Sequence, residues 1–267
     1  ALNAADVGLS MGDGTAVAKE ASDMTIQDNS FSTIANAVMW GRSLFKNIQR
    51  FVMFQLTINV AACALVLLGS FLGTDTPLNV TQMLWVNLIM DTFAAIALAS
   101  LPPDKKVMSE KPRKVNDSII SKAMARNIML IGGLFTAILL IVFIDMQHSA
   151  FESVLSLFDF AYGDFGEIDS LEHSIFFTMF VMLQFWNMFN AKAFMTGRPA
   201  FEGITKCRGF LLIALVILIG QILIVEIGSD MFRLQPLRLK DWIWIILLTS
   251  PVMLIPEILR YLKRHLM

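Results

Sequence analysis

Long apolar runs alternate with short polar segments over most of the chain. Each run is close to the roughly 20 residues that a helix needs to cross a bilayer. The runs predict six membrane-spanning helices, at approximately 51–72, 80–100, 127–146, 173–191, 210–228 and 242–260. We therefore expect a mainly α, polytopic fold in which residues 51–267 form a six-helix transmembrane bundle.

The first residues follow a different pattern. Apolar stretches at 7–11 and 23–27 are separated by a Gly-rich turn at 12–15 and a helical stretch at 16–21. Strand, helix and strand in this order are typical of the edge of an α/β domain. The turn lacks a P-loop lysine and any GxGxxG spacing, so a plain turn is favoured over a phosphate cradle. Residues 1–30 are predicted to be the end of a soluble α/β domain.

A long helix is predicted to join these two regions. Apolar residues recur at helical spacing from residue 31 onward, and no Gly–Pro break separates them from the first span. One helix of about 40 residues would be roughly 60 Å long. Residues 31–50 are therefore expected to form a stalk that continues into the membrane.

Composition supports a membrane protein. The 267 residues are 56% hydrophobic and only 16% charged, whereas soluble domains carry about 25% charge. Cys63 and Cys207 lie far apart, without the spacing of a metal site or a disulfide framework, and the three histidines are scattered. The expected partner is the lipid bilayer, and no nucleic acid is expected.

The loop charges predict an orientation. Lys and Arg are concentrated before the first span, between spans two and three, between spans four and five, and after the last span, whereas the loop after span three is acidic. By the positive-inside rule both ends are cytoplasmic, although Arg233, Arg238 and Lys240 after span five break the pattern. The chain opens like the interior of a soluble domain, so we expect it to be part of a longer polypeptide.

Polar residues inside two neighbouring spans are the first candidates for a site. Asn87 and Asp91 are four residues apart, which places them on one face of a regular α-helix. An ionised carboxylate at bilayer depth costs at least ~3 kcal/mol. A short loop joins spans one and two, so Asn59 of span one is expected to face this pair.

Span four adds Gln184, Asn187 and Asn190. One carboxylate with several amide oxygens is the donor set that hard cations such as calcium and magnesium prefer. These residues do not complete the roughly six to eight oxygens of a calcium shell, so carbonyls, water or residues outside the chain would supply the rest. For the three amides of span four, interhelical hydrogen bonding is an equally good interpretation.

Several stretches resemble one known family. ALNAADVGLSMGDGTAVAKEASDMTIQDNSFSTI resembles the end of the phosphorylation domain of P-type ATPases. QLTINV, WVNLIMDT and FVMLQFWNMFNAK are most similar to the calcium-transporting, plasma-membrane type (type IIB). The resemblance covers essentially the whole chain and makes it a C-terminal fragment of such a pump.

The resemblance implies a function and a site. An Asp outside this chain would be phosphorylated by ATP with magnesium, calcium would be exported, and protons would typically return. Spans one to six would be the family's fifth to tenth, residues 1–30 the end of its HAD-like phosphorylation domain, and Asn59, Asn87 and Asp91 would take calcium-ligand positions. Ala62, Met90 and Gln184 depart from pumps that move two ions, which implies a single site, with Gln184 and Asn187 as accessory polar residues.

Further expectations concern the context of the chain. ATP and magnesium would bind outside it, so the isolated chain is expected neither to hydrolyse ATP nor to transport. Only seven residues follow Arg260, too few for a calmodulin-binding helix, which suggests a bacterial inner-membrane protein. The missing N-terminal part of the same polypeptide is the expected protein partner.

Three alternatives stay open at this point. A six-span cation channel or secondary carrier would use Asp91 in its ion path but needs neither stalk nor α/β head. A membrane scaffold would use the polar residues only to join helices. Within the pump interpretation, manganese or another cation could replace calcium, because its ligand preference is nearly the same.

Overall fold

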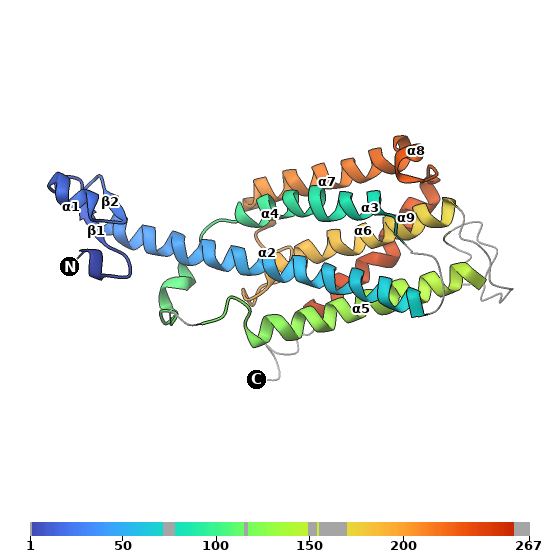
Figure 1. The fold of residues 1–267 in the computed structure, drawn as a ribbon, viewed down its shortest axis with the longest axis horizontal. Helices are drawn as coiled ribbons and strands as arrows, with labels where there is room; N and C mark the ends of the chain where they lie inside the picture. Colours follow the sequence, from blue (N-terminus) through green and yellow to red (C-terminus); the bar gives the residue numbers. More distant parts are fainter. Residues whose placement is uncertain (1, 72–77, 115–116, 149–153, 155–169, 259–267) are drawn as a thin grey trace. The chain divides into compact units, whose positions relative to one another are not determined.

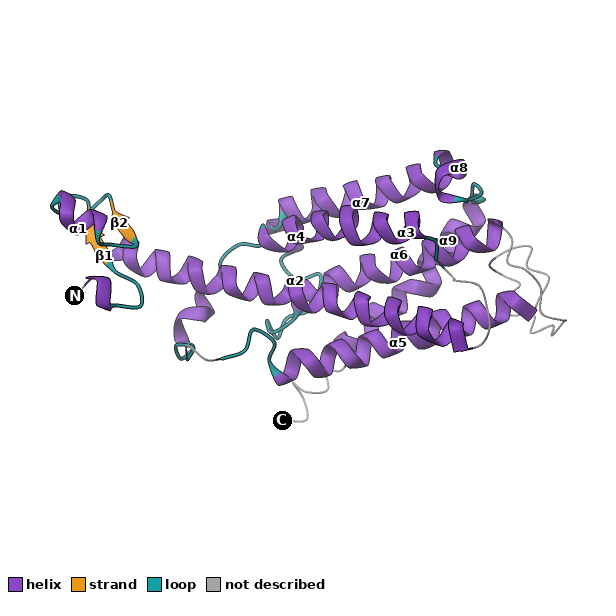
Figure 2. Ribbon diagram, in the orientation of Figure 1, coloured by secondary structure: helices purple, strands orange, loops and turns teal. Residues whose placement is uncertain are grey.

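A computed structural model of the chain describes residues 2–71, 78–114, 117–148, 154 and 170–258 (Figure 1). Helices make up most of the described residues, and the two strands lie near the N-terminus (Figure 2). Three features of the sequence analysis fall outside the described residues. They are the loop between spans one and two, most of the acidic loop after span three, and the tail after Arg260.

The chain divides into two compact units. The first comprises residues 1–46 and 102–117, and the second comprises residues 47–101 and 118–267. Residues 102–117, which the sequence analysis treated as a membrane loop, thus belong with the head and the first part of the stalk. The assignment of residues 1–30 to a phosphorylation domain remains a prediction.

The head has the predicted order of strand, helix and strand. After a short 3-10 turn at Leu2–Ala4 come β1 (Leu9–Met11), α1 (Ala16–Glu20) and β2 (Met24–Ile26), and the two strands pair in parallel. The backbone N–H of Gly12 donates to the carbonyl of Ile26, and a Cβ at this position would lie 2.7 Å from the Gln27 carbonyl oxygen. This close approach requires glycine, so a structural turn explains Gly12 without a phosphate.

Helix α2 (Phe31–Phe71) is a single unbroken helix of 41 residues, which confirms the predicted fusion of stalk and first span. Asp28 lies just before it and accepts hydrogen bonds from the Thr33 hydroxyl and the Ser30 backbone N–H. These bonds hold the pKa of the Asp28 carboxyl below its ordinary value, Thr33 contributing most. The carboxylate therefore stabilises the start of the helix, where the backbone N–H groups are unpaired.

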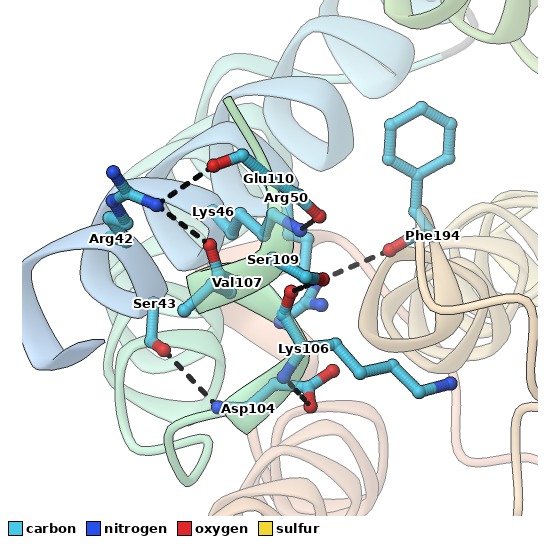
Figure 3. A network of polar contacts seen from close by, with 10 residues as sticks. All are labelled: Arg42, Ser43, Lys46, Arg50, Asp104, Lys106, Val107, Ser109, Glu110 and Phe194. Carbon is cyan, nitrogen blue, oxygen red and sulfur yellow. Dashed lines mark hydrogen bonds and ion pairs between the residues drawn. The ribbon is translucent and has the colours of Figure 1, made fainter. Parts of the chain in front are cut away.

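Residues 102–117 pack on the stalk part of α2. Arg42 donates to the backbone carbonyls of Val107 and Glu110, each at 3.0 Å, and the Ser43 hydroxyl accepts from the Asp104 N–H at 3.2 Å (Figure 3). Lys46 forms an ion pair with the Glu110 carboxylate. The basic residues before the first span, which the sequence analysis read as an orientation signal, thus also bind this loop.

The second unit is a bundle of long helices. Among the described residues, five helical segments are long and apolar enough to cross a membrane, and they match five of the six predicted spans: Phe31–Phe71, Val80–Ala99, Lys122–Gln147, Arg208–Ile227 and Leu239–Ile258. The structural elements of this unit after α2 are α3 (Val80–Leu84), a π-helical turn η2 (Trp85–Met90), α4 (Asp91–Ala99), α5 (Lys122–His148), α6 (Ser170–Ala193), η5 (Ile204–Lys206), α7 (Arg208–Ile227), α8 (Ser229–Phe232), α9 (Leu239–Thr249) and η6 (Ser250–Met253).

The fourth predicted span, 173–191, lies within α6 but is not among those five segments. Almost all of α6 is buried, and it packs against α5, α7, α9 and η6. Phe176, Phe177 and Phe180 on α6 are at most 2% exposed. A helix surrounded by protein can carry more polar residues than one facing lipid, which lowers its apolar character. That α6 crosses the membrane remains a prediction.

Helices α2 and α5 approach each other closely. A Cβ at Gly132 of α5 would lie 3.1 Å from both the Thr57 carbonyl oxygen and the Cγ1 atom of Val60 on α2. Small residues at such contacts let the backbones of membrane helices pack directly against each other.

Candidate ion-binding site

The helical segment that carries Asp91 begins with a strong N-terminal cap. Asn79 Oδ1 accepts from the Gln82 backbone N–H at 2.8 Å, and Gln82 Oε1 accepts from the Asn79 N–H at 3.0 Å. This reciprocal capping box satisfies two N–H groups that would otherwise lack partners at the start of a helix. It fixes where the second span begins.

The segment then changes its hydrogen-bond register at η2. The N–H of Asp91 donates to the carbonyl of Val86, five residues earlier, instead of to that of Asn87. Asp91 therefore stacks over Val86, and both are buried, at 3% and 1% exposure. Asn87 is exposed. The expectation that Asn87 and Asp91 share one face assumed a regular α-helix, and the π-helical turn separates them.

Asp91 is a buried carboxylate without a hydrogen-bond partner. Neither carboxylate oxygen is hydrogen-bonded to any residue that the structure describes. Met90 and Ala94 beside it are also buried and apolar. Since an unpaired charge in such surroundings is costly, the site requires a cation or a proton on Asp91.

The structure places Asn59 on α2, half-buried between the fully buried Ile58 and Ala61. It is not hydrogen-bonded to Asp91, whose oxygens have no described partner. Ala62, one turn after Ile58, is buried as well. That Asn59 and Asp91 bind the same ion therefore remains a prediction.

The amides of α6 fall into two classes. Asn190 donates to the Val252 carbonyl of η6 at 3.3 Å, so it joins two helical elements as the interhelical interpretation expects, although its own side-chain oxygen is buried without a partner among the described residues. Gln184 is 0% exposed, and neither its amide nitrogen nor its oxygen has a partner among the described residues. The amide nitrogen of Asn187 is likewise buried and unpartnered. Gln184 and Asn187 are thus available to a ligand or to water.

Gln221 of α7 is a buried polar residue that the sequence analysis did not single out. It is 0% exposed, its oxygen accepts from the indole N–H of Trp85 at 3.2 Å, and its amide nitrogen has no described partner. Its position in the middle of the apolar run RGFLLIALVILIGQILIVEI was the available signal. We call Asp91, Gln184, Asn187 and Gln221 the polar core.

The polar core is built on three helices that pack against one another, α4, α6 and α7. Its donors are a carboxylate and amide groups, the ligand types of hard cations. Among the residues that the structure describes, no group of three or more His, Cys, Asp or Glu side chains is placed to hold a metal. The polar core itself comprises one carboxylate, that of Asp91, and three side-chain amides.

Asn47 and Arg50 connect α2 to the ends of two of these helices. The Asn47 amide donates to the Leu101 carbonyl at 3.2 Å, just after α4. Arg50 donates to the Asn47 side chain at 2.7 Å and to the Phe194 carbonyl, just after α6, at 3.3 Å (Figure 3). These hydrogen bonds join α2 to the ends of the helices that carry Asp91 and Gln184.

Comparison with known proteins places the chain in a family. The profile of the family described as "Cation transporting ATPase, C-terminus" matches residues 75–262. The chain is also similar to three plasma membrane calcium-transporting ATPases, each over 93% of its length. The identity is 41% to plasma membrane calcium-transporting ATPase 2 of Oreochromis mossambicus, and 40% and 39% to plasma membrane calcium-transporting ATPase 1 of Gallus gallus and of Homo sapiens. The chain spans only 20–22% of the length of these relatives. It belongs to the cation-transporting ATPases and contains the C-terminal region of that family.

Proposed function

We propose that the chain is the C-terminal membrane part of an ATP-driven, calcium-exporting P-type ATPase. The observation that carries this proposal is the buried carboxylate of Asp91, which lacks any described partner. The names of the relatives, plasma membrane calcium-transporting ATPases, support calcium as the cargo. ATP, magnesium and the phosphorylated Asp would belong to the part of the pump outside this chain.

In the proposed site, Asn59, Asn87 and Asp91 contribute ligands to a single calcium ion. Asp91 supplies the negative charge, and calcium compensates the cost of burying it. The π-helical turn supports this role, because such turns are frequent at functional sites. Asn87, on an exposed face of the same turn, would meet ligands supplied by the rest of the polypeptide.

The proposed cycle returns protons in exchange for calcium. When calcium leaves, Asp91 is again an unpaired buried carboxylate, and a proton is the simplest way to neutralise it. Movement of the phosphorylation domain would reach the site through α2, because Asn47 and Arg50 join α2 to the ends of α4 and α6.

The proposal also covers location and partners. The pump would be a multi-pass plasma-membrane protein, in a bacterium the inner membrane, with both ends of this chain cytoplasmic. Its partners would be the bilayer and the N-terminal part of its own polypeptide.

The test is ATP-driven uptake of labelled calcium into inverted membrane vesicles that contain the complete pump. We expect Asp91→Asn to lower uptake by at least about tenfold, the equivalent of ~1.4 kcal/mol or more of lost ion binding. Asp241→Asn is the matched control, because Asp241 is also 3% exposed but accepts from the Val154 N–H at 3.3 Å. Uptake by this control should stay within about twofold of the unchanged pump.

Competition by manganese and magnesium identifies the cargo. Manganese that is taken up in preference to calcium would keep the pump and change its substrate. Uptake driven by an ion gradient without ATP would favour a channel or carrier. Full calcium uptake by Asp91→Asn would contradict the site.

A further inference from the structure

The second span, Val80–Ala99, contacts α7 and α8 at three levels along its length. Near its start, the side-chain amides of Asn79 and Gln82 donate to the Phe232 carbonyl of α8, at 2.8 and 3.3 Å. Near its end, a Cβ at Gly209 of α7 would lie 3.1 Å from the Ser100 hydroxyl oxygen. The third contact lies between these two, at the π-helical turn.

This middle contact is made by Trp85, the first residue of η2. Its indole N–H donates to Gln221 Oε1 at 3.2 Å. Its ring lies on Gly220, where a Cβ would be 3.1 Å from the Cη2 atom and 3.3 Å from the Cζ2 atom. The indole is thus fixed by a directional hydrogen bond and by a surface that only glycine leaves open.

A π-helical turn needs such a contact to persist. π-Helices are rare and occur mostly as single turns within α-helices. If the segment returned to the α register, the Asp91 N–H would bond to the Asn87 carbonyl in place of Val86. Asp91 would then rotate relative to α6 and α7. Because both ends of the span are also attached to α7 or α8, sliding of the whole helix cannot absorb that rotation.

We infer that Gln221 and Gly220 of α7 are positioning residues for the ion site: they hold Trp85 and thereby maintain the π-helical turn that orients Asp91. The inference rests on the proposed function, in that Asp91 is taken as the ion ligand. It assigns to Gln221, one of the polar-core residues, the role of positioning Asp91 and not of binding the ion. The burial of a glutamine in the middle of α7, at 0% exposure, is explained by this role.

The test measures calcium dependence of ATP hydrolysis by the complete pump. The variants are Gln221→Leu, which removes the acceptor, Trp85→Phe, which removes the donor, and the double variant. Loss of this hydrogen bond should raise the calcium concentration for half-maximal activity about tenfold. The maximal rate at saturating calcium should be retained, because positioning of the site, and not the fold, is impaired.

The double variant and a matched control separate this bond from general packing. The combined effect should equal that of one single variant, because both substitutions break the same bond. Trp242→Phe is the control, since the Trp242 indole N–H donates to Glu226 of the same helix α7 at 3.0 Å and not to Gln221. Its calcium dependence should match that of the unchanged pump.

Gly220→Ala tests the steric half of the contact. Its added methyl group displaces the ring, so half-maximal activity should again shift to higher calcium. Unchanged calcium dependence in Gln221→Leu or Gly220→Ala, additive effects in the double variant, or an equal shift in Trp242→Phe would each overturn the inference. Failure of the proposed function would look different, because then the unchanged pump itself would show no calcium-dependent hydrolysis.

Discussion

Helices α6 and α7 show that apolar character and centrality are different properties in this bundle. Helix α7 is the most apolar of the five segments able to cross a membrane. Only 28% of its most apolar stretch is buried within the protein, the smallest share among the five. Helix α6 is not among the five, although nearly all of its residues are buried. Of these two helices the more apolar one is the less buried, but the rule does not extend to the apolar segment Lys122–Gln147, whose buried share of 44% is the largest of the five.

The difference has a physical origin. Lipid tails offer no hydrogen bonds, so a helix facing them must be apolar all round its exposed side. A helix surrounded by other helices gains its stability from packing and interhelical hydrogen bonds, and it can hold polar groups for function. The buried phenylalanines of α6 pack in the core, whereas buried amide atoms of Gln184 and Asn187 have no partner among the described residues.

The largest expected contrast concerns stability. Phe177→Ala on α6, at 0% exposure, should lower the free energy of unfolding by about 3–5 kcal/mol, because it opens a cavity. Leu212→Ala on α7, at 64% exposure, should cost under about 1 kcal/mol, because lipid fills the space. Thermal inactivation of the pump in detergent measures the stability of both variants. Equal losses of stability would contradict the proposed distinction between the two helices.

A second contrast lies within α6 itself. Gln184→Leu removes two unpartnered polar atoms, so the free energy of unfolding should stay level or rise by about 1 kcal/mol. Asn190→Leu breaks the bond to Val252 and should lower it by about 1 kcal/mol. If Gln184 helps to bind calcium, Gln184→Leu should also raise the calcium concentration needed for half-maximal activity. Destabilisation by Gln184→Leu would show that the amide is structural.

The smallest expected effect concerns Trp186, which lies between Gln184 and Asn187 in the sequence. Its indole donates to the Thr249 hydroxyl at 3.0 Å, and that hydroxyl still donates to the Ile245 carbonyl when the indole is gone. Trp186→Phe should therefore cost only about 0.5–1.5 kcal/mol. Thermal inactivation alongside Thr249→Val checks it, since a much larger loss in Trp186→Phe would mean that the indole packs as well as bonds.

Local signals predicted the parts of the fold that depend on neighbouring residues. Apolar periodicity predicted α2 as one helix, and turn chemistry predicted the order of β1, α1 and β2. The packing of residues 102–117 on the stalk was missed, because it depends on Arg42 reaching carbonyls more than 60 residues away. The sequence of a charged loop has the same pattern whether its charged side chains face solvent or bind another segment.

The site was predictable in composition and less so in geometry. Asp91 stands out in any membrane helix, and the structure shows it buried. The different burial of Asn87, which is exposed, and Asp91, which is buried, could not be predicted from their spacing, and a π-helical turn has no reliable sequence signal. Gln221 was visible as a polar residue, but its partner Trp85 is distant in sequence.

The contact at Gly132 limits how α2 can move. Two helices that touch through long side chains can rock, because the side chains change rotamer, but a glycine has no rotamers to change. A Cβ at Gly132 would lie only 3.1 Å from the Thr57 carbonyl oxygen of α2, so a larger residue there would force the two helices apart or displace their side chains. Gly132 therefore sets the spacing between α2 and α5 at this level.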